Sequence, residues 1–412
     1  MSIMPLLLAA RAAKPAVALY SEEQRNRLLL AMADALEGAA EAILEANAAD
    51  LQNAEGKIAP VMMDRLRLTP ARIAEMAGGV RSVAALPCPL EQVESETVSA
   101  AGLAIQKVRV PMGVVAIVYE SRPNVTSDAA ALCLKSGNVC LLRGGSDAIL
   151  SNTAIVDALR GALKKAGADP DTLLLVTDTS HESVNEMMQA RGYIDLLIPR
   201  GGLGLITACV EGARGVPVIE TGTGICHVYV DKAADLDMAL AILYNAKTSR
   251  PSVCNSAEVC LVHRDVAAAF LPRAAQRLAE GNVELRLDAR AAALIPGTAA
   301  GPEDFDTEFL DFILAVAVVD DADSAIRHIN VHSTGHSDAI VTADEETARR
   351  FLRQVDSAAV YWNCSTRFTD GAVFGLGCEM GISTQKLAAR GPMGLYELTS
   401  YQYRIAGNGQ IR

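Results

Sequence analysis

Residues 114–147 read VVAIVYESRPNVTSDAAALCLKSGNVCLLRGGSD, and this stretch decides the fold. Two short runs rich in β-branched and aliphatic residues, at 114–119 and 139–142, enclose a segment that we expect to be helical. Continuous apolar runs of this length are typical of strands in a parallel sheet with both faces covered. A glycine pair follows the second run and precedes another expected helix. The stretch therefore predicts a strand–helix–strand unit.

The same alternation continues to the C-terminal part of the chain. We expect further strands at 173–176, 194–198 and 216–219, and a second series at 228–230, 259–262, 314–319, 339–341 and 359–361. The first ~80 residues are expected to be mostly helical, because Ser21 and Gln24 form a capping box before an apolar helical pattern. The sequence predicts an α/β fold with two parallel-sheet domains.

Two segments, 93–110 and 398–405, instead alternate apolar and polar residues as exposed antiparallel strands do. No helix is expected to cover them. Because unpaired strand edges expose N–H and C=O groups, a symmetric partner commonly covers such edges. We expect at least a homodimer. The alternative is an edge sheet within one chain.

Composition excludes several classes of function. The chain has 412 residues and a net charge of −12, which disfavours nucleic acid and anionic membrane surfaces as partners. Its nine cysteines form no CxxC pair, so we expect no disulfide framework and no structural zinc site. His332 and His336 could mimic a metal-binding pair, but Gly335 disfavours the helix that would align them. The apolar start lacks a basic segment, and we expect a cytoplasmic protein.

Two glycine turns lie between an expected strand and an expected helix. The first is Arg143-Gly144-Gly145-Ser146, and the second contains Gly201 and Gly202. Glycines allow close approach of the backbone, and a helix start presents free N–H groups to phosphate. One such turn is more often only a turn, and neither GxGxxG nor a Walker lysine is present. Two in adjacent units suggest a dinucleotide site.

Cys254 lies in the polar segment 245–256, whereas most other cysteines lie in apolar runs. Lys247 and Arg250 are close in sequence, and a nearby cation would lower the pKa of the thiol. This pattern indicates a reactive cysteine. A small buried apolar residue is the alternative.

Several motifs together carry a family resemblance. Ile219-Glu220-Thr221-Gly222, Cys254, Thr307-Glu308-Phe309 and Tyr361-Trp362-Asn363 follow in the order seen in the aldehyde dehydrogenase superfamily, which the chain resembles. Within it, the motifs at 119–126, 250–255, 365–371 and 389–395 are similar to the gamma-glutamyl phosphate reductase family. The resemblance implies a cofactor-binding domain at 1–92 and 112–222, a catalytic domain at 223–394, and oligomerisation segments at 93–111 and 395–412.

The resemblance also implies an activity: reduction of L-glutamyl 5-phosphate by NADPH to glutamate 5-semialdehyde and phosphate, the second step of proline biosynthesis. Cys254 would be the nucleophile that forms a thioacyl intermediate. Its backbone amide and Asn124 are the candidate oxyanion donors, although a register count places Glu120 nearer the family's asparagine. Glu220 would position the nicotinamide, shuttle a proton or cap a loop.

The remaining candidates bind cofactor or substrate. Arg143 and Ser146 would contact the 2′-phosphate and favour NADPH, while Glu308 would hold the nicotinamide ribose. The substrate carboxylate and phosphate need cations, and the candidates within family motifs are Arg122, Lys247, Arg250, Arg367 and Arg390. A non-phosphorylating aldehyde dehydrogenase is the rival function. Association with glutamate kinase, the upstream enzyme, is left open.

Overall fold

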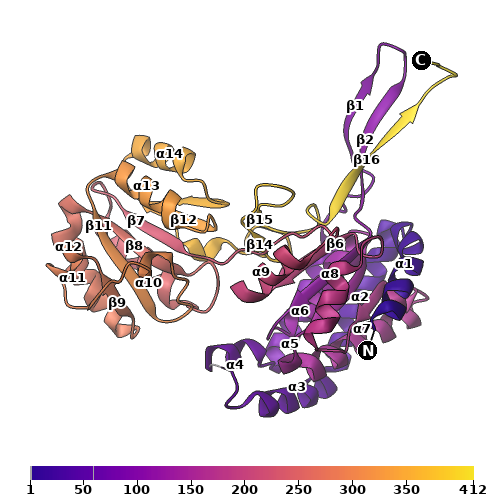
Figure 1. The fold of residues 1–412 in the computed structure, drawn as a ribbon, viewed down its shortest axis with the longest axis horizontal. Coiled ribbons are helices and arrows are strands. Elements are labelled where there is room, and N and C mark those ends of the chain that lie inside the picture. Colours follow the sequence, from indigo (N-terminus) through magenta and orange to yellow (C-terminus); the bar gives the residue numbers. More distant parts are fainter. Residues whose placement is uncertain (1, 59) are drawn as a thin grey trace. The chain divides into compact units, whose positions relative to one another are not determined.

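The computed structural model describes residues 2–58 and 60–412 and divides into two compact units (Figure 1). Unit 1 comprises Met1–Thr221, Gly375–Gly381 and Met393–Arg412. Unit 2 comprises Gly222–Phe374 and Ile382–Pro392.

A four-stranded parallel sheet forms the centre of unit 1, in the order β5-β4-β3-β6. Its strands are β3 (Val114–Tyr119), β4 (Val139–Gly144), β5 (Leu173–Leu175) and β6 (Leu196–Arg200). Every residue of β3 is buried, as its unbroken apolar run predicts. The strand expected at 216–219 is wrong: only an isolated bridge between Leu197 and Val218 forms there, next to Pro217, which has no N–H to donate.

Nine α-helices belong to the described part of unit 1, and the first five precede all strands, as the sequence predicts. They are α1 (Met4–Ala18), α2 (Glu22–Gly38), α3 (Ala40–Ala54), α4 (Pro60–Leu66), α5 (Pro70–Ala85), α6 (Asn124–Lys135), α7 (Ile149–Lys165), α8 (His181–Gln189) and α9 (Leu203–Gly212). Ser21 caps α2 by accepting a hydrogen bond from the Gln24 amide at 3.1 Å. One core cluster joins α1 and α8 to the β3–β4 pair.

A three-stranded antiparallel sheet extends from unit 1 and contains both segments that alternate in the sequence (Figure 1). It is formed by β1 (Val93–Val98), β2 (Ala104–Pro111) and β16 (Thr399–Ala406), in the order β1-β2-β16. Ser400 pairs with Val110 and Ile405 with Ile105. The predicted antiparallel strands are confirmed, and they bring the C-terminal segment against residues near 105.

Unit 2 contains a seven-stranded, entirely parallel sheet in the order β10-β9-β11-β8-β7-β12-β13. Its strands are β7 (Cys226–Val230), β8 (Ala257–His263), β9 (Glu284–Leu287), β10 (Thr298–Ala299), β11 (Ile313–Val319), β12 (Ser337–Val341) and β13 (Ala359–Trp362). A short antiparallel pair, β14 (Ile382–Ser383) and β15 (Gly391–Pro392), completes the unit.

Separate core clusters cover the two faces of this sheet. Helices α10 (Leu236–Thr248), α11 (Arg264–Glu280) and α12 (Ala289–Ala292) pack on one face, and α13 (Ala322–His332) and α14 (Glu345–Gln354) pack on the other. The two parallel sheets and the small antiparallel sheet confirm the expected fold class. Within residues 2–58 and 60–412, no helix is long and apolar enough to cross a membrane.

Candidate active site

Cys254 lies in the loop that joins the end of α10 to the start of β8. Its side chain is partly exposed, whereas Asn255 and Ser256 are buried. The segment 222–226 packs directly against this loop. A β-carbon on Gly224 would lie 1.5 Å from the Cys254 carbonyl oxygen, and the Cys226 thiol donates to the same oxygen at 3.1 Å. Glycine at 224 is therefore required for the two segments to meet.

The motif at 365–371 holds the residue that follows the cysteine. The Asn255 side-chain amide donates to the Thr369 carbonyl at 2.8 Å, and the Thr366 hydroxyl donates to the Asn255 carbonyl at 2.7 Å. The Arg367 guanidinium also donates to the Asn255 side-chain oxygen. Two family motifs that lie more than 100 residues apart in sequence therefore meet at the position next to Cys254.

One cation, Arg367, interacts electrostatically with the Cys254 thiol. Burial lowers the pKa of the Arg367 guanidinium, while attraction to a Cys254 thiolate acts in the opposite direction. Repulsion from the Arg250 guanidinium lowers the pKa of Arg367 as well. A cation close to a thiol favours its thiolate form. The arrangement can therefore activate Cys254 and attract an anionic substrate.

Glu308 supplies a carboxylate to this site. Its carboxylate accepts a hydrogen bond from the Gly224 amide at 2.7 Å. The Glu308 loop is thus tied to the segment that supports Cys254, and the carboxylate and the thiol belong to one unit.

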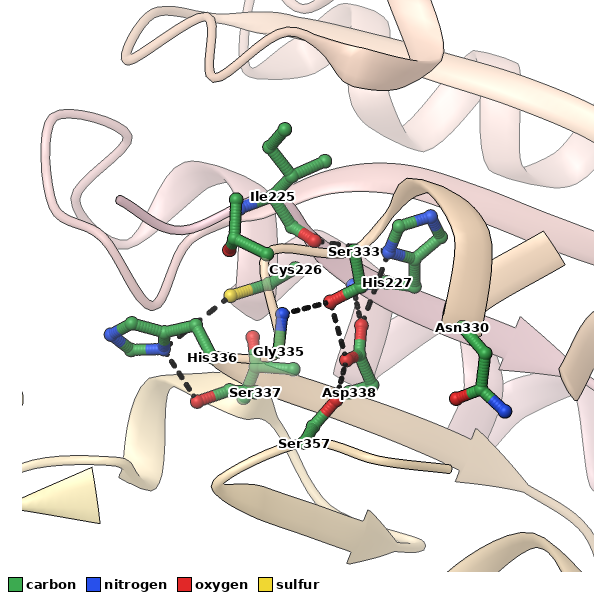
Figure 2. A network of polar contacts seen from close by, with 12 residues as sticks. Ile225, Cys226, His227, Asn330, Ser333, Gly335, His336, Ser337, Asp338 and Ser357 are labelled. Carbon is green, nitrogen blue, oxygen red and sulfur yellow. Dashed lines mark hydrogen bonds and ion pairs between the residues drawn. The ribbon is translucent and has the colours of Figure 1, made fainter. Parts of the chain in front are cut away.

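A buried polar network surrounds the start of β7, the strand that begins at Cys226 (Figure 2). The Asp338 carboxylate accepts from the His227 backbone amide at 2.7 Å, from the Ser333 hydroxyl at 2.8 Å and from the Ser357 hydroxyl. The His227 ring nitrogen Nδ1 lies 3.1 Å from the same carboxylate. These contacts hold His227 in register with Asp338 of β12.

His332 and His336 lie in different surroundings. His336 is fully buried, and its Nδ1 lies 2.8 Å from the Ser337 hydroxyl (Figure 2). His332 contacts the Asp306 carboxylate at 2.8 Å. Among the described residues, no group of three or more His, Cys, Asp or Glu side chains could hold a metal ion.

Two of the candidate substrate cations are engaged elsewhere in unit 2. Lys247 is fully buried, and its ammonium lies 2.6 Å from the equally buried Glu258 carboxylate. Its ammonium is therefore not available to a substrate in this structure, which corrects the expectation that the family motif places Lys247 at the substrate. Arg390 pairs with the Asp356 side chain at 2.8 Å and also donates to the Asp356 carbonyl. Arg367 interacts electrostatically with Cys254, and Arg250 interacts electrostatically with Arg367.

The first glycine turn, in unit 1, is closely packed. A β-carbon on Gly144 would lie 2.1 Å from the Asn152 amide of α7, so this glycine allows the helix to approach β4. The Arg143 guanidinium is buried and donates to the backbone carbonyls of Thr179 and Ser180. Arg143 therefore supports this loop and can offer its charge, rather than a free bidentate face, to a phosphate. Gly145 leads into a 3₁₀ turn that starts at the exposed Ser146.

The second turn is more open. Gly202 caps α9, is exposed, and would have open space around an added β-carbon. The start of α9 therefore presents exposed backbone N–H groups, and the first N–H groups of a helix attract anions. The Gly202 amide donates to the Glu120 carboxylate at 3.1 Å, and a β-carbon on Gly201 would collide with that same carboxylate at 2.4 Å.

The remaining candidate site residues of unit 1 are Arg122 and Asn124, which follow β3, and Glu220, which lies just before unit 2. Asn124 is the exposed first residue of α6, and its amide donates to the Asp128 carboxylate at 3.1 Å. Burial raises the pKa of Asp128 to about 6. Arg122 and Glu220 are half-buried.

Sequence reasoning missed Gly224, Cys226 and Glu258, although a glutamate within the apolar run of β8 signals a buried partner.

The comparisons with known proteins agree with this architecture. The model of the aldehyde dehydrogenase family matches residues 4–302 and 305–389, so the chain belongs to the aldehyde dehydrogenase family. A gamma-glutamyl phosphate reductase of Streptococcus suis is 59% identical over 408 residues, which cover 99% of this chain and 98% of that relative. The crystal structure of gamma-glutamyl phosphate reductase from Thermotoga maritima is 43% identical, covers 100% of both chains and superposes with a TM-score of 0.95.

A more distant solved structure shares the fold alone. Glyceraldehyde-3-phosphate dehydrogenase from Methanocaldococcus jannaschii, complexed with NADP, is 16% identical with a TM-score of 0.73, and the match covers 98% of this chain and 94% of that one. The two reductases confirm the resemblance that the motifs around Cys254, Arg367 and Arg390 indicate.

Proposed function

We propose that this chain reduces L-glutamyl 5-phosphate to glutamate 5-semialdehyde with NADPH, as a step of proline biosynthesis. The observation that carries the proposal is a partly exposed cysteine with an arginine, Arg367, in its electrostatic field, in a chain 59% identical over almost its whole length to a gamma-glutamyl phosphate reductase. A thiol near cations suits an anionic acyl phosphate as its electrophile.

The first chemical step belongs to Cys254. Its thiolate attacks the acyl carbon, a carbon–sulfur bond forms, and the carbon–oxygen bond to phosphate breaks with its electron pair leaving on phosphate. Arg367 supplies positive charge near the thiol, where it can stabilise both the thiolate and the departing phosphate, and Arg250 adds positive charge that acts on Arg367. The product of this step is a thioester on Cys254.

The second step reduces that thioester. A nicotinamide cofactor, when bound, would supply the hydride for the thioester carbon. The resulting oxyanion expels the Cys254 thiolate and becomes the aldehyde, which restores the enzyme. The Cys254 backbone amide and the Asn124 side chain are the proposed oxyanion donors, and each lost donor typically costs several kcal/mol of barrier. Asn255, held by four hydrogen bonds to residues 366–369, keeps the nucleophile's backbone in place.

Glu308 and the exposed start of α9 are the proposed cofactor contacts. The Glu308 carboxylate suits ribose hydroxyls as donors, and the N–H groups after Gly202 suit the pyrophosphate. Arg143 adds positive charge near the first turn, which favours NADPH over NADH. Glu220 is assigned to positioning the nicotinamide or moving a proton, because activation of water would hydrolyse the thioester.

The nucleophile is tested by replacing Cys254 with alanine. We expect turnover to be lost while NADP⁺ binding, measured by calorimetry, stays close to wild type. Cys364 is a second partly exposed thiol in the same unit, and Cys364→Ala serves as the matched control that should retain activity. Substantial turnover in Cys254→Ala would refute the assignment.

We also propose that the chain forms at least a dimer through the β1-β2-β16 sheet. Apolar and aromatic side chains on β16 are exposed, with Tyr401 at 51%, Tyr403 at 58% and Ile405 at 60%. A symmetric copy would cover these side chains and satisfy the free strand edge in both subunits.

A further inference from the structure

A fully buried ion pair spans the base of the loop that carries Cys254. Lys247 is the next-to-last residue of α10, and Glu258 is the second residue of β8. Their charged groups lie 2.6 Å apart, and both side chains have 0% exposure. The pair therefore closes residues 248–257 into a loop whose two ends cannot separate without exposing a buried charge.

The same carboxylate holds a second loop. One oxygen of Glu258 contacts Lys247, and the other accepts a hydrogen bond from the Leu310 amide at 3.2 Å. Leu310 has a φ of 55°, in the left-handed region that leucine rarely adopts. A residue persists in this conformation only when its surroundings hold it there. Glu258 supplies that restraint at Leu310, which lies two residues after Glu308.

These contacts form a closed circuit around the active site. The carboxylate of Glu258 binds the Leu310 amide, and Glu308 of the same loop accepts from the Gly224 amide at 2.7 Å. Gly224 in turn packs against the carbonyl of Cys254, which lies four residues before Glu258. One side chain thus relates the position of Glu308 to that of Cys254.

Stability alone does not explain this pair. Burial raises the pKa of Glu258 to about 8 and lowers the pKa of Lys247, so the charged forms are costly here, although each partner favours the other's charge. Glu308 also repels a charged Glu258, and Asp311 favours charged Lys247. Buried ion pairs can often be replaced by apolar residues without loss of stability. An apolar pair would lack the acceptor for Leu310.

We propose that Glu258 is a positioning residue that sets the Glu308 loop for cofactor binding by restraining Leu310. The proposal rests on the proposed function, because it assigns Glu308 to the nicotinamide ribose. Lys247 acts through Glu258 by fixing the direction of its carboxylate.

Two double variants separate the restraint from the buried charge. K247M/E258Q removes both charges and keeps a side-chain oxygen for the Leu310 amide, whereas K247M/E258M removes both charges and that oxygen. We expect both to bind NADP⁺, but K247M/E258M about three- to tenfold more weakly than K247M/E258Q, as loss of one hydrogen bond predicts. The rate of Cys254 alkylation by iodoacetamide should agree within about twofold between the two variants. Equal NADP⁺ affinities for two folded variants would overturn the proposal.

A rescue experiment adds a readout that a general packing defect would not produce. Glycine adopts a positive φ without strain, so Leu310→Gly in the K247M/E258M background should recover part of the NADP⁺ affinity. A further loss of affinity would contradict the restraint.

The wild-type chain offers a measurement that needs no variant. The Leu310 amide is bonded to a buried carboxylate, so it should exchange with deuterium far more slowly than an exposed amide, with and without NADP⁺. Exchange at the rate of an exposed amide would overturn the proposal even if K247M/E258M failed to fold. If the wild-type protein reduced no NADP⁺ with glutamate 5-semialdehyde and phosphate, the proposed function would fail. The deuterium-exchange and NADP⁺-binding results would still test whether Glu258 restrains Leu310.

Discussion

Gly224 and Cys254 are in such close contact that an added β-carbon on Gly224 would lie 1.5 Å from the Cys254 carbonyl oxygen and 2.9 Å from its α-carbon. Both obstructing atoms belong to the backbone, so no side-chain rotation relieves the collision. The segment 222–226 and the nucleophile loop therefore form one fixed unit.

Gly224→Ala should consequently disable the enzyme. The added methyl group must displace either the Cys254 loop or the segment 222–226. The first displacement moves Cys254, and the second breaks the hydrogen bond from the Gly224 amide to Glu308. A displacement of about 1 Å can cost on the order of a hundredfold in rate. Steady-state kcat/KM and thermal unfolding measure the two effects. Gly161→Ala, in the interior of α7 with open space around its β-carbon, is the control and should stabilise the protein by about 0.5–1 kcal/mol. Unchanged kcat/KM in Gly224→Ala would contradict the close contact.

Acid should destabilise the protein partly through His328. Burial lowers the pKa of this ring to about 3, and positive charge on His227 and His332 acts in the same direction. The unfolded chain therefore binds a proton near pH 6.5 that the folded chain refuses until about pH 3, so stability falls as pH decreases through this window. Between pH 7.5 and 5 the loss is at most about 2 kcal/mol.

The variant His328→Phe keeps a ring against Phe305, which lies 5.3 Å away between ring centroids. Its unfolding free energy, from urea titrations at both pH values, should fall less than that of wild type. An identical decrease in the two proteins would show that His328 titrates normally.

Cofactor preference tests the role of Arg143. If its charge favours the 2′-phosphate, Arg143→Ala should lower the ratio of kcat/KM for NADPH to that for NADH. Some loss of stability is also expected, because the guanidinium bonds the carbonyls of Thr179 and Ser180. Arg160→Ala is the matched control, since Arg160 also donates to backbone carbonyls in unit 1. A ratio that changes equally in both variants, or in neither, argues that another group recognises the phosphate.

Assembly is tested by shortening the C-terminal strand. Removal of residues 400–412 deletes almost all of β16 but retains the carbonyls of Leu398 and Thr399, which bond Asn138 and Arg109. The exposed edge of β2 and the lost aromatic surface should shift the protein toward monomer or aggregate. Light scattering on dilute samples measures the change. An intact chain that is monomeric at micromolar concentration would rule out the dimer.

Much of the fold could be predicted because buried parallel strands have a clear sequence pattern. The six residues of β3 match their predicted bounds, since an apolar run between a turn and a helix permits few alternatives. The sequence pattern does not predict β9, because the charged residues Glu284 and Arg286 interrupt its apolar pattern. The neighbouring strand β10 has only two residues, which is too short for a pattern.

The site was less predictable than the fold. Motifs located Cys254, but closeness in sequence suggested that Lys247 lies beside the thiol. Helical periodicity instead places Lys247 on the face of α10 that contains Ala239 and Leu243, which are buried. Contacts such as Gly224 with Cys254 depend on segments that only the tertiary structure brings together.

The central claim is that a Cys254 thioester is exchanged with phosphate rather than with water. The most direct measurement is NADP⁺ reduction by glutamate 5-semialdehyde, followed with and without inorganic phosphate. A phosphorylating enzyme should reduce NADP⁺ only when phosphate is present, because phosphate is the nucleophile that releases the acyl group from Cys254. Reduction at the same rate without phosphate would contradict the account and favour a non-phosphorylating aldehyde dehydrogenase.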